Sequence, residues 1–309
     1  MRKLIYLMAA LLLLSPVIAE AELSADELPA TSTWYFHVDF KEMRSSDAGR
    51  RLYQWLDEEA FQEIRDETGV DFRKEVDELT AYSLQDAGPV IVLQGPISQD
   101  SKDKVMAIAA ASGDIKPHKA SGKSYFFFSG NDEHDHDSDS GDINIEFEDD
   151  EAYFSLALKD KIIITSSKEQ MGYMLGNGGR IDAQRNHRDA LFVLSAERNL
   201  LQAGADTKNF AGNGDWDSNI LRNTRQLALL VADVKGKIAI DAQLLATEPE
   251  MADSLASIAR GLISLASFSD DMEPEVAELL RNTKVAVKDS MLSVSLAMDP
   301  EALVSMLED

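Results

Sequence analysis

The feature that most constrains the fold is an order of strands and helices that occurs twice along the chain. In both halves the sequence predicts a strand, a helical region, a β-hairpin, a helix, a second hairpin and a short helix. Apolar alternation predicts the opening strand of the first half at 34–40, and an apolar run predicts that of the second half at 190–194. Turn residues at 86–88 and 233–236 predict the first hairpin of each half. This repetition indicates a structural duplication, with chance agreement inside one irregular α+β domain as the alternative.

The second hairpin of each half turns on the same dipeptide. A Lys-Asp pair stands at 159–160 and again at 288–289, each time between two apolar runs. Hairpins followed by amphipathic helices are typical of antiparallel sheets with helices on one face. We therefore expect an α+β fold with two similar sheet-plus-helix units in tandem, at 22–178 and 188–309.

Cap residues locate the helices between these strands. The first helical region stops near Gly69, and Ser166 with Glu169 forms a capping box for the short helix that closes the first half. A further helix is predicted over 249–266. The apolar residues spaced along one face of that helix are Met251, Leu255, Ile258, Leu262 and Leu265. We expect this face to pack into the core rather than to form a partner groove.

The two halves differ in length between equivalent turns. Gly88 lies 71 residues before Lys159, whereas Gly236 lies 52 residues before Lys288. The longer interval contains the acidic segment 130–142, which has two of the five histidines and no apolar side chain. Such a segment has nothing to pack, and loop insertions cost little closure entropy. We expect a solvated loop added to the first unit.

The acidic segment is also the one candidate ion site. Imidazoles two residues apart lie on the same side of an extended chain and suit zinc, while carboxylates at alternate positions suit calcium. The candidate ligands are His134, Asp135, His136, Asp137 and Asp139. A solvated loop that binds no ion is the alternative.

A calcium loop of the EF-hand type is disfavoured in this segment. Asp135 would take the first position of the loop and Glu146 the twelfth, but Ser140 stands where the loop requires glycine. The flanking sequence is also typical of strands rather than helices. We therefore expect zinc or calcium to bind weakly if at all, with His118 as a further zinc ligand.

The N-terminus has the three parts of an export signal at 1–21. Arg2 and Lys3 precede an apolar stretch, and residues 19–21 read Ala-Glu-Ala, a cleavage motif. The mature chain would begin near Glu22, in the periplasm or outside the cell, and no later segment reaches the length of a membrane span. The chain has no cysteine, which excludes a lipid anchor on cysteine and any disulfide.

The charge of the chain excludes two classes of partner. It has 55 Asp and Glu against 30 Lys and Arg, a net charge of −25. Nucleic acid phosphates must be met by Lys and Arg, and anionic membrane surfaces attract basic segments. We expect neither to be a partner.

The sequence has no convergent catalytic motif. It lacks both a G-x-S-x-G elbow and an H-E-x-x-H pair. His37 is expected on the polar face of a strand and His118 in a Pro/Lys loop, both at the surface. We identify no catalytic or cofactor-binding residue.

The sequence therefore favours a non-enzymatic binding or interaction module of the cell envelope, whose partner is a periplasmic protein or a small ligand. The aromatic side chains of the strands, as at 34–36 and 125–128, are expected in the core. If some lie on an exposed sheet face, they form an apolar binding surface. The alternative functions are a periplasmic metal-binding protein and a hydrolase with dispersed catalytic residues.

Overall fold

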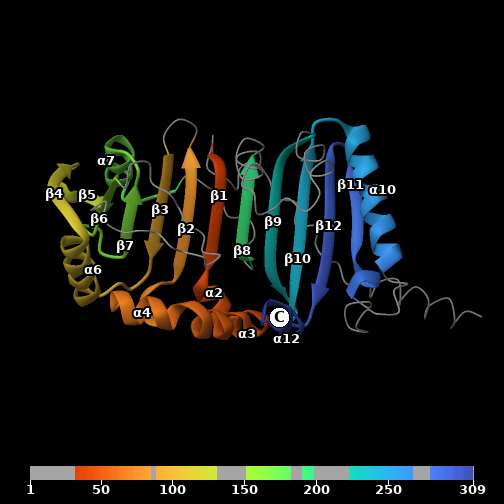
Figure 1. The fold of residues 1–309 in the computed structure, drawn as a ribbon, viewed down its shortest axis with the longest axis horizontal. Coiled ribbons are helices and arrows are strands. Elements are labelled where there is room, and N and C mark those ends of the chain that lie inside the picture. Colours follow the sequence, from red (N-terminus) through yellow and green to blue (C-terminus); the bar gives the residue numbers. More distant parts are fainter. Residues whose placement is uncertain are drawn as a thin grey trace, which may run out of the picture.

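The strands form one continuous antiparallel sheet. The computed structural model describes residues 32–84, 88–130, 151–181, 190–197, 223–266 and 279–308. The sheet has twelve strands in the order β11-β12-β10-β9-β8-β1-β2-β3-β7-β6-β5-β4, with helices along its lower edge and at both ends (Figure 1). The predicted α+β class is confirmed, and the strands of both halves share a single sheet.

The strands of the first half precede residue 166. Their bounds are β1 (Ser32–Asp39), β2 (Glu78–Leu84), β3 (Gly88–Gln94), β4 (Gly113–Ala120), β5 (Lys123–Gly130), β6 (Glu151–Ser155) and β7 (Lys161–Thr165). The strands of the second half are β8 (Ala190–Glu197), β9 (Thr224–Val234), β10 (Lys237–Ala246), β11 (Lys284–Lys288) and β12 (Met291–Met298). All of the predicted hairpin turns fall between consecutive strands.

The two halves meet at the centre of the sheet, where β1 and β8 pair in antiparallel orientation. Outward from this junction, the order of strands is β1-β2-β3-β7-β6 on one side and β8-β9-β10-β12-β11 on the other. Both sides therefore follow the same connectivity. The first half continues beyond β6 with the additional hairpin β5-β4. A tandem duplication predicts this order, and the superposition of the two units stays a prediction.

Short helices follow β1 and run along the lower edge of the sheet (Figure 1). They are α2 (Phe40–Ser45), α3 (Asp47–Leu56), a π-helical turn η2 (Asp57–Phe61), α4 (Gln62–Thr68) and α5 (Phe72–Glu75). The Asp39 carboxylate caps α2 by accepting from the Glu42 N–H at 2.8 Å. Gly69 ends α4 with a φ of 69°, the left-handed conformation that glycine adopts most easily, so the predicted stop is confirmed.

The remaining helices follow strands of both halves. They are α6 (Gln99–Ser112), α7 (Lys168–Gly176), α10 (Pro249–Ala266) and α12 (Pro300–Glu308). The predicted capping box is wrong by one residue, because Ser167 rather than Ser166 caps α7 and accepts from the Gln170 N–H at 3.3 Å. The Ser166 N–H instead donates to the Pro89 carbonyl at 3.1 Å, which keeps Ser166 aligned with β3.

Cross-strand pairs assign the side chains to two faces of the sheet. Phe36 stands opposite Leu194, and Leu194 stands opposite Leu229, so these residues share one face, which we call the Leu194 face. Tyr35 alternates with Phe36 and lies on the other face, the Tyr35 face. Helix α7 covers part of the Tyr35 face with Met174 and its neighbours, in one buried cluster with Tyr35.

The helices of the lower edge form a second core with strands of both halves. The Phe40 ring meets the Phe61 ring edge-on at a centroid distance of 5.2 Å. Val76, Leu191 and Ile238 belong to the same cluster and are fully buried. This cluster ties α2 and η2 to β8 and β10, so both halves depend on it.

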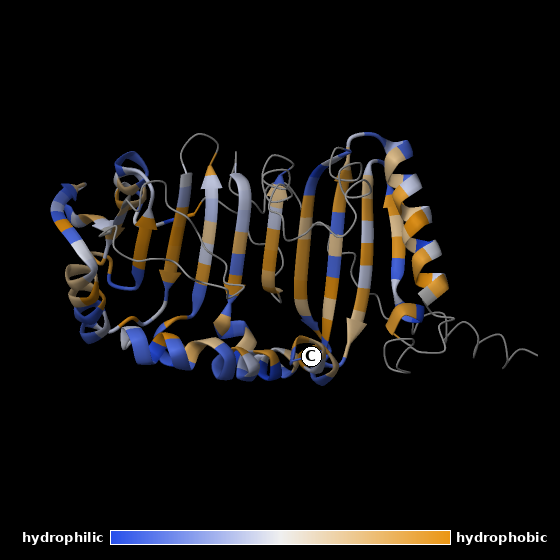
Figure 2. Ribbon diagram, in the orientation of Figure 1, coloured by the Kyte–Doolittle hydropathy of each residue, from blue (hydrophilic) through white to orange (hydrophobic). Residues whose placement is uncertain are grey.

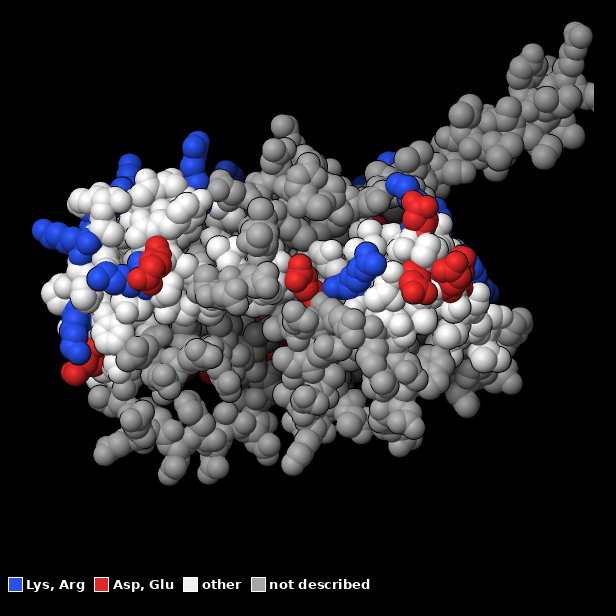
Figure 3. Space-filling model, turned by 90° about the horizontal axis from the view of Figure 1, so that it is seen from above, with Lys and Arg blue, Asp and Glu red and all other residues white. Residues whose placement is uncertain are grey.

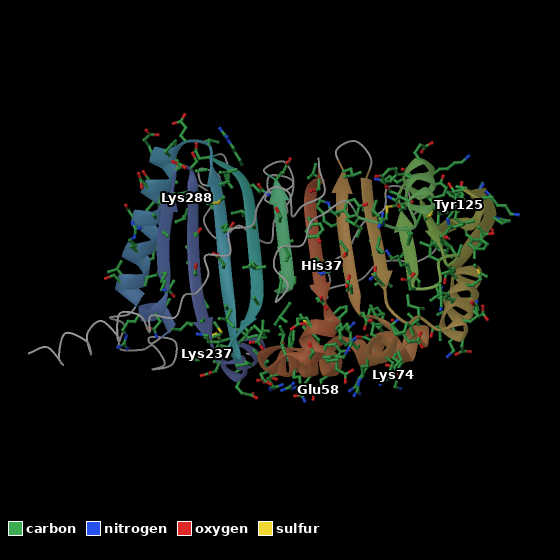
Figure 4. All side chains as sticks on the ribbon, turned by 180° about the vertical axis from the view of Figure 1, so that it is seen from behind. His37, Glu58, Lys74, Tyr125, Lys237 and Lys288 are labelled. Atoms are coloured by element: carbon green, nitrogen blue, oxygen red, sulfur yellow. The ribbon has the colours of Figure 1, made fainter. Side chains whose placement is uncertain are left out.

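Two predicted histidine positions are wrong. His37 is only 2% exposed, and its Nδ1 lies 2.8 Å from the Thr80 hydroxyl oxygen, because the face predicted to be polar is the buried Tyr35 face. Figure 4 shows His37 in the central part of the sheet. His118 lies in strand β4 rather than in a loop, and its ring stacks on Tyr125 at 5.3 Å. The sheet tolerates Pro117 in β4 because β4 is its outermost strand.

Some sequence predictions lie outside the described residues and stay predictions. They concern the export signal at 1–21 and the acidic segment at 131–142. Within the described part of the chain, none of the helices combines the length and the apolar character needed to cross a lipid bilayer.

Candidate ligand groove

An apolar surface runs across the second half of the sheet on the Leu194 face. Leu194 of β8 pairs with Leu229 of β9, Leu229 with Ala242 of β10, and Ala242 with Val294 of β12. Figure 2 shows apolar residues recurring at intervals along β9, β10 and β12. Because paired residues point to the same side, the register places a row of apolar side chains across four strands.

This row forms the floor of a groove of about 390 Å³. The residues that line the groove are Leu194, Ala196, Leu227, Ala228, Leu229, Ala242, Gln243, Leu244, Leu292 and Val294. Ala228 and Gln243 occupy alternate strand positions, so their side chains belong to the Tyr35 face and they line the groove with backbone atoms. The side chains that face the groove are therefore all aliphatic.

Two packed clusters border the groove. On the outer side, Leu255 and Ala256 of α10 pack against Leu292. Leu244 and Val294 contact the same cluster and also line the groove. On the inner side, Leu229 contacts the core that is built on the lower-edge helices. The groove is thus bordered by two packed apolar clusters, and its lining residues belong to strands rather than to a loop.

Leu194 shows how open the groove is. This side chain is 37% exposed although β8 lies between β9 and β1 in the middle of the sheet. Leu191 of the same strand is fully buried, and Leu230 of β9, which belongs to the Tyr35 face, is 4% exposed. A large aliphatic side chain open to water on an inner strand is typical of a surface that receives an apolar partner.

The predicted packing of α10 holds only for its first part. Leu255 is 7% exposed, but Leu262 and Leu265 on the same apolar stripe are 57% and 73% exposed. The helix contacts β10, β11 and β12, and its stripe continues past the residues that make these contacts. The prediction that the whole apolar face is core is therefore wrong for the C-terminal part of the helix.

The lining of the groove provides binding rather than chemistry. No titratable side chain lines it among the described residues. Polar contacts lie on the Tyr35 face, where the Gln226 amide donates to the Ser195 hydroxyl at 2.7 Å and the Gln243 amide to the Asp241 carboxylate at 3.3 Å. The groove offers neither a nucleophile nor a general base. Its chemistry suits the apolar part of a ligand.

The predicted ion site in the acidic segment stays a prediction. His134, Asp135, His136, Asp137 and Asp139 all lie outside the described residues. Within the described ranges no cluster of three or more His, Asp or Glu is arranged to hold a metal ion. His118, the further zinc ligand that the sequence suggested, does lie within the described residues. It belongs to β4, and its ring stacks on the Tyr125 ring of β5.

Comparison with known proteins finds similarity at the level of solved structures. No protein-family model matches the chain, and it has no match among curated proteins. Among solved structures it is similar to three crystal forms of TP0453. Forms III, IV and I give TM-scores of 0.44, 0.46 and 0.41 at 8%, 10% and 9% sequence identity. The alignments cover 91%, 90% and 93% of this chain and 96%, 93% and 97% of TP0453.

Sequence reasoning missed the groove although its residues were read correctly as strands. The apolar runs at 190–194 and 227–231 signal strands. They do not signal whether a helix covers one face of these strands. The alternative that some strand side chains lie on an exposed sheet face was the sequence-based expectation that came nearest to this groove.

Proposed function

We propose that this chain is a non-enzymatic binding protein of the cell envelope whose groove on the Leu194 face holds the apolar part of a small ligand, such as an acyl chain. The observation that carries the proposal is the exposed Leu194 at the floor of an all-aliphatic groove on an inner strand. The predicted export signal at 1–21 supports the location.

The size of the groove supports a small ligand rather than a whole protein surface. Its volume of about 390 Å³ falls within the range of small-molecule sites, roughly 300–1,000 Å³. Removing apolar surface from water gives about 25 cal/mol for each Å² buried, so an aliphatic chain seated on Leu194, Leu227 and Leu244 would gain binding energy without any polar contact. A polar headgroup would stay outside the groove, where water solvates it.

Binding of a neutral apolar dye tests the proposal. N-phenyl-1-naphthylamine is titrated into the purified protein and fluorescence enhancement is followed. Leu194→Glu places a charge on the groove floor, and Ala242→Phe fills the groove with an apolar ring. We expect each variant to weaken dye binding about tenfold or more, since each removes the contact area on which an aliphatic site depends.

The matched control is Leu307→Glu, which makes the same change at a leucine that is 48% exposed on α12, outside the groove. It should bind the dye like the parent protein. Circular dichroism and thermal melts establish that all three variants are folded. Equal dye affinity in the parent protein and in folded Ala242→Phe would exclude the groove as the ligand site, and a competing acyl-chain amphiphile that displaces the dye would identify the ligand class.

The location has its own test. The mass of the protein recovered from the periplasmic fraction should correspond to a chain that begins at Glu22. A full-length product that remains in the cytoplasm would contradict export without affecting the groove.

A further inference from the structure

A second pocket, lined mainly by basic side chains, lies between the lower-edge helices. It has a volume of about 460 Å³. The charged residues that line it are Arg44, Arg50, Arg65, Arg73, Lys74 and Asp71, with Tyr53 and Gln54 between them. The basic pocket shares no residue with the apolar groove, which is built on β8, β9, β10 and β12.

Most charged residues that line the basic pocket are cations, whereas the chain as a whole is negatively charged. Five cations and one carboxylate line the basic pocket, whereas acidic residues outnumber basic ones by 55 to 30 in the whole protein. On the upper edge, seen in Figure 3, basic and acidic side chains lie among one another. Figure 4 places Lys74 on the opposite, lower edge. The gathering of cations is therefore a property of the pocket lining, because the helices that follow β1 also carry many acidic residues.

Neighbouring carboxylates hold several of these cations in position. Arg73 contacts the Asp57 carboxylate at 3.2 Å, and Arg44 is paired with Asp77 while its Nη1 donates to the Val76 carbonyl at 3.0 Å. These acidic partners do not line the basic pocket. A guanidinium has several N–H donors in a planar fork, so one that is fixed by a carboxylate on one side retains donors for a ligand on the other.

Asp71 does not neutralise the lining. Its carboxylate lies 2.8 Å from the Lys74 Nζ, and this hydrogen bond lowers the pKa of Asp71. The pair is internally compensated. Each of the four arginines likewise has a carboxylate partner outside the lining, so the pocket offers a ligand their remaining N–H donors rather than an excess of charge.

Tyr53 adds a neutral donor beside the arginines. Its hydroxyl oxygen lies 3.3 Å from the Arg44 Nη1, from which it accepts, and the phenolic hydrogen is left for donation. Burial raises the pKa of Tyr53 and the Arg44 contact opposes this, with the rise prevailing. The phenol thus stays protonated at neutral pH.

We propose that the basic pocket binds the phosphate group of a small phosphate ester. Arginine forks match the oxygens of phosphate, and charge-assisted hydrogen bonds to such groups are the stronger kind. The volume exceeds that of an inorganic ion and leaves room for the organic part of the ester. Because the chain as a whole repels anionic surfaces, a soluble ester is the source that the charge distribution favours over a phospholipid headgroup.

Calorimetric titration of the purified protein tests this proposal with glycerol 3-phosphate as the probe, and with glycerol at equal concentration as the blank. The variant is Arg50→Gln with Arg65→Gln, which removes two cations that are 53% and 36% exposed. We expect its affinity for glycerol 3-phosphate to fall about tenfold or more, and parent binding to weaken as salt is raised. The matched control is Lys168→Gln with Arg180→Gln, an equal loss of charge at exposed positions outside the pocket, and it should bind like the parent protein.

Vesicles distinguish the source of the phosphate. Sedimentation with phosphatidylglycerol vesicles, against phosphatidylcholine vesicles, shows whether a lipid headgroup is bound. Loss of sedimentation in the Arg50/Arg65 variant but not in the control would assign the pocket to a headgroup. Glycerol 3-phosphate binding that the same variant weakens would assign it to a soluble ester. Equal binding by variant and parent, or no binding of either probe by the parent, would overturn the proposal. The dye assay of the groove is independent of every one of these outcomes.

Discussion

The two halves of the sheet order their strands alike but carry helices on opposite faces. In the first half, α7 packs on the Tyr35 face, where Met174 and Leu175 are almost completely buried. In the second half, α10 packs on the Leu194 face, where it covers Leu292 and the outer strands. Strand order alone therefore does not decide which face of a unit is buried. The groove exists because α10 covers only part of its face.

The largest expected effect compares a covered leucine with an uncovered one. Leu175→Ala leaves a cavity under α7, where the side chain has no exposure, and should cost about 3 kcal/mol of unfolding free energy. Leu194→Ala removes a side chain that is already 37% exposed and should cost about 1 kcal/mol or less. Urea denaturation of both variants measures the two values. Similar costs would show that the Leu194 face is as tightly packed as the Tyr35 face.

The next comparison concerns one cation on each of the helices α6 and α10. The Lys102 ammonium, on a residue that is 4% exposed, donates to the carbonyls of Leu156 at 3.3 Å and Lys159 at 3.1 Å. Arg260 is exposed and donates to the Val285 carbonyl at 3.0 Å. Lys102→Met should cost about 2 kcal/mol, because buried carbonyls lose a charged donor.

Arg260→Met is the matched variant, and it should change the unfolding free energy by about 0.5 kcal/mol or less, since water replaces the lost donor. Denaturation at neutral pH compares the two. A cost for Arg260→Met as large as that for Lys102→Met would mean that both halves rely equally on such contacts.

A smaller effect depends on pH. The hydrogen bond from Lys74 lowers the pKa of Asp71 below its ordinary value of 3.8. The stability that this pair adds is therefore present above that value and is lost as the pH falls through the folded pKa. Lys74→Met should be less stable than the parent protein at pH 7 by less than about 1 kcal/mol, because the Lys74 side chain is 80% exposed to water. The difference should vanish in acid.

The second half offers the control for this pH effect. Lys237 lies 3.9 Å from Asp299, a looser contact between exposed side chains. Lys237→Met should show no comparable difference between neutral and acid pH. Thermal melts over pH 2–7 compare the variants, and a Lys74→Met deficit that persists in acid would contradict the assignment.

The smallest effect on stability is expected from the acidic segment, which has no equivalent in the second half. Deletion of residues 131–142 should change the unfolding free energy by about 0.5 kcal/mol or less, because the segment has no apolar side chain to bury. Calorimetric titration with Zn²⁺ and Ca²⁺ separately tests the predicted ligands His134 to Asp139. Identical isotherms for the parent protein and the deletion would remove the metal-binding hypothesis.

Local signals predicted most of the fold. Gly69 and Asp233–Gly236 act through backbone conformation and through hydrogen bonds within a few residues, such as the Gly236 N–H to the Asp233 carboxylate at 2.8 Å. These interactions involve residues that are close in sequence, so they do not depend on the tertiary arrangement. The turn at 288–289 likewise depends on local backbone conformation, since Asp289 has a φ of 53°.

What the sequence could not predict depends on contacts between distant segments. His37 is buried because residues far along the chain form the Tyr35 face, and β4 was missed because Pro117 normally argues against a strand unless the strand is an edge. The cations of the basic pocket are dispersed over residues 44–74 and come together only when the lower-edge helices fold back. No local pattern encodes that convergence.

The ends of the sheet have a consequence for self-association. A strand at an open edge can accept a strand from another molecule, and a sheet of this length offers two such edges. In β4, Pro117 has no N–H to donate, and lysines at 116 and 119 repel a similar strand. At β11, the Arg260 guanidinium already occupies the Val285 carbonyl. Both edge strands thus carry a feature that disfavours pairing with a strand of another molecule.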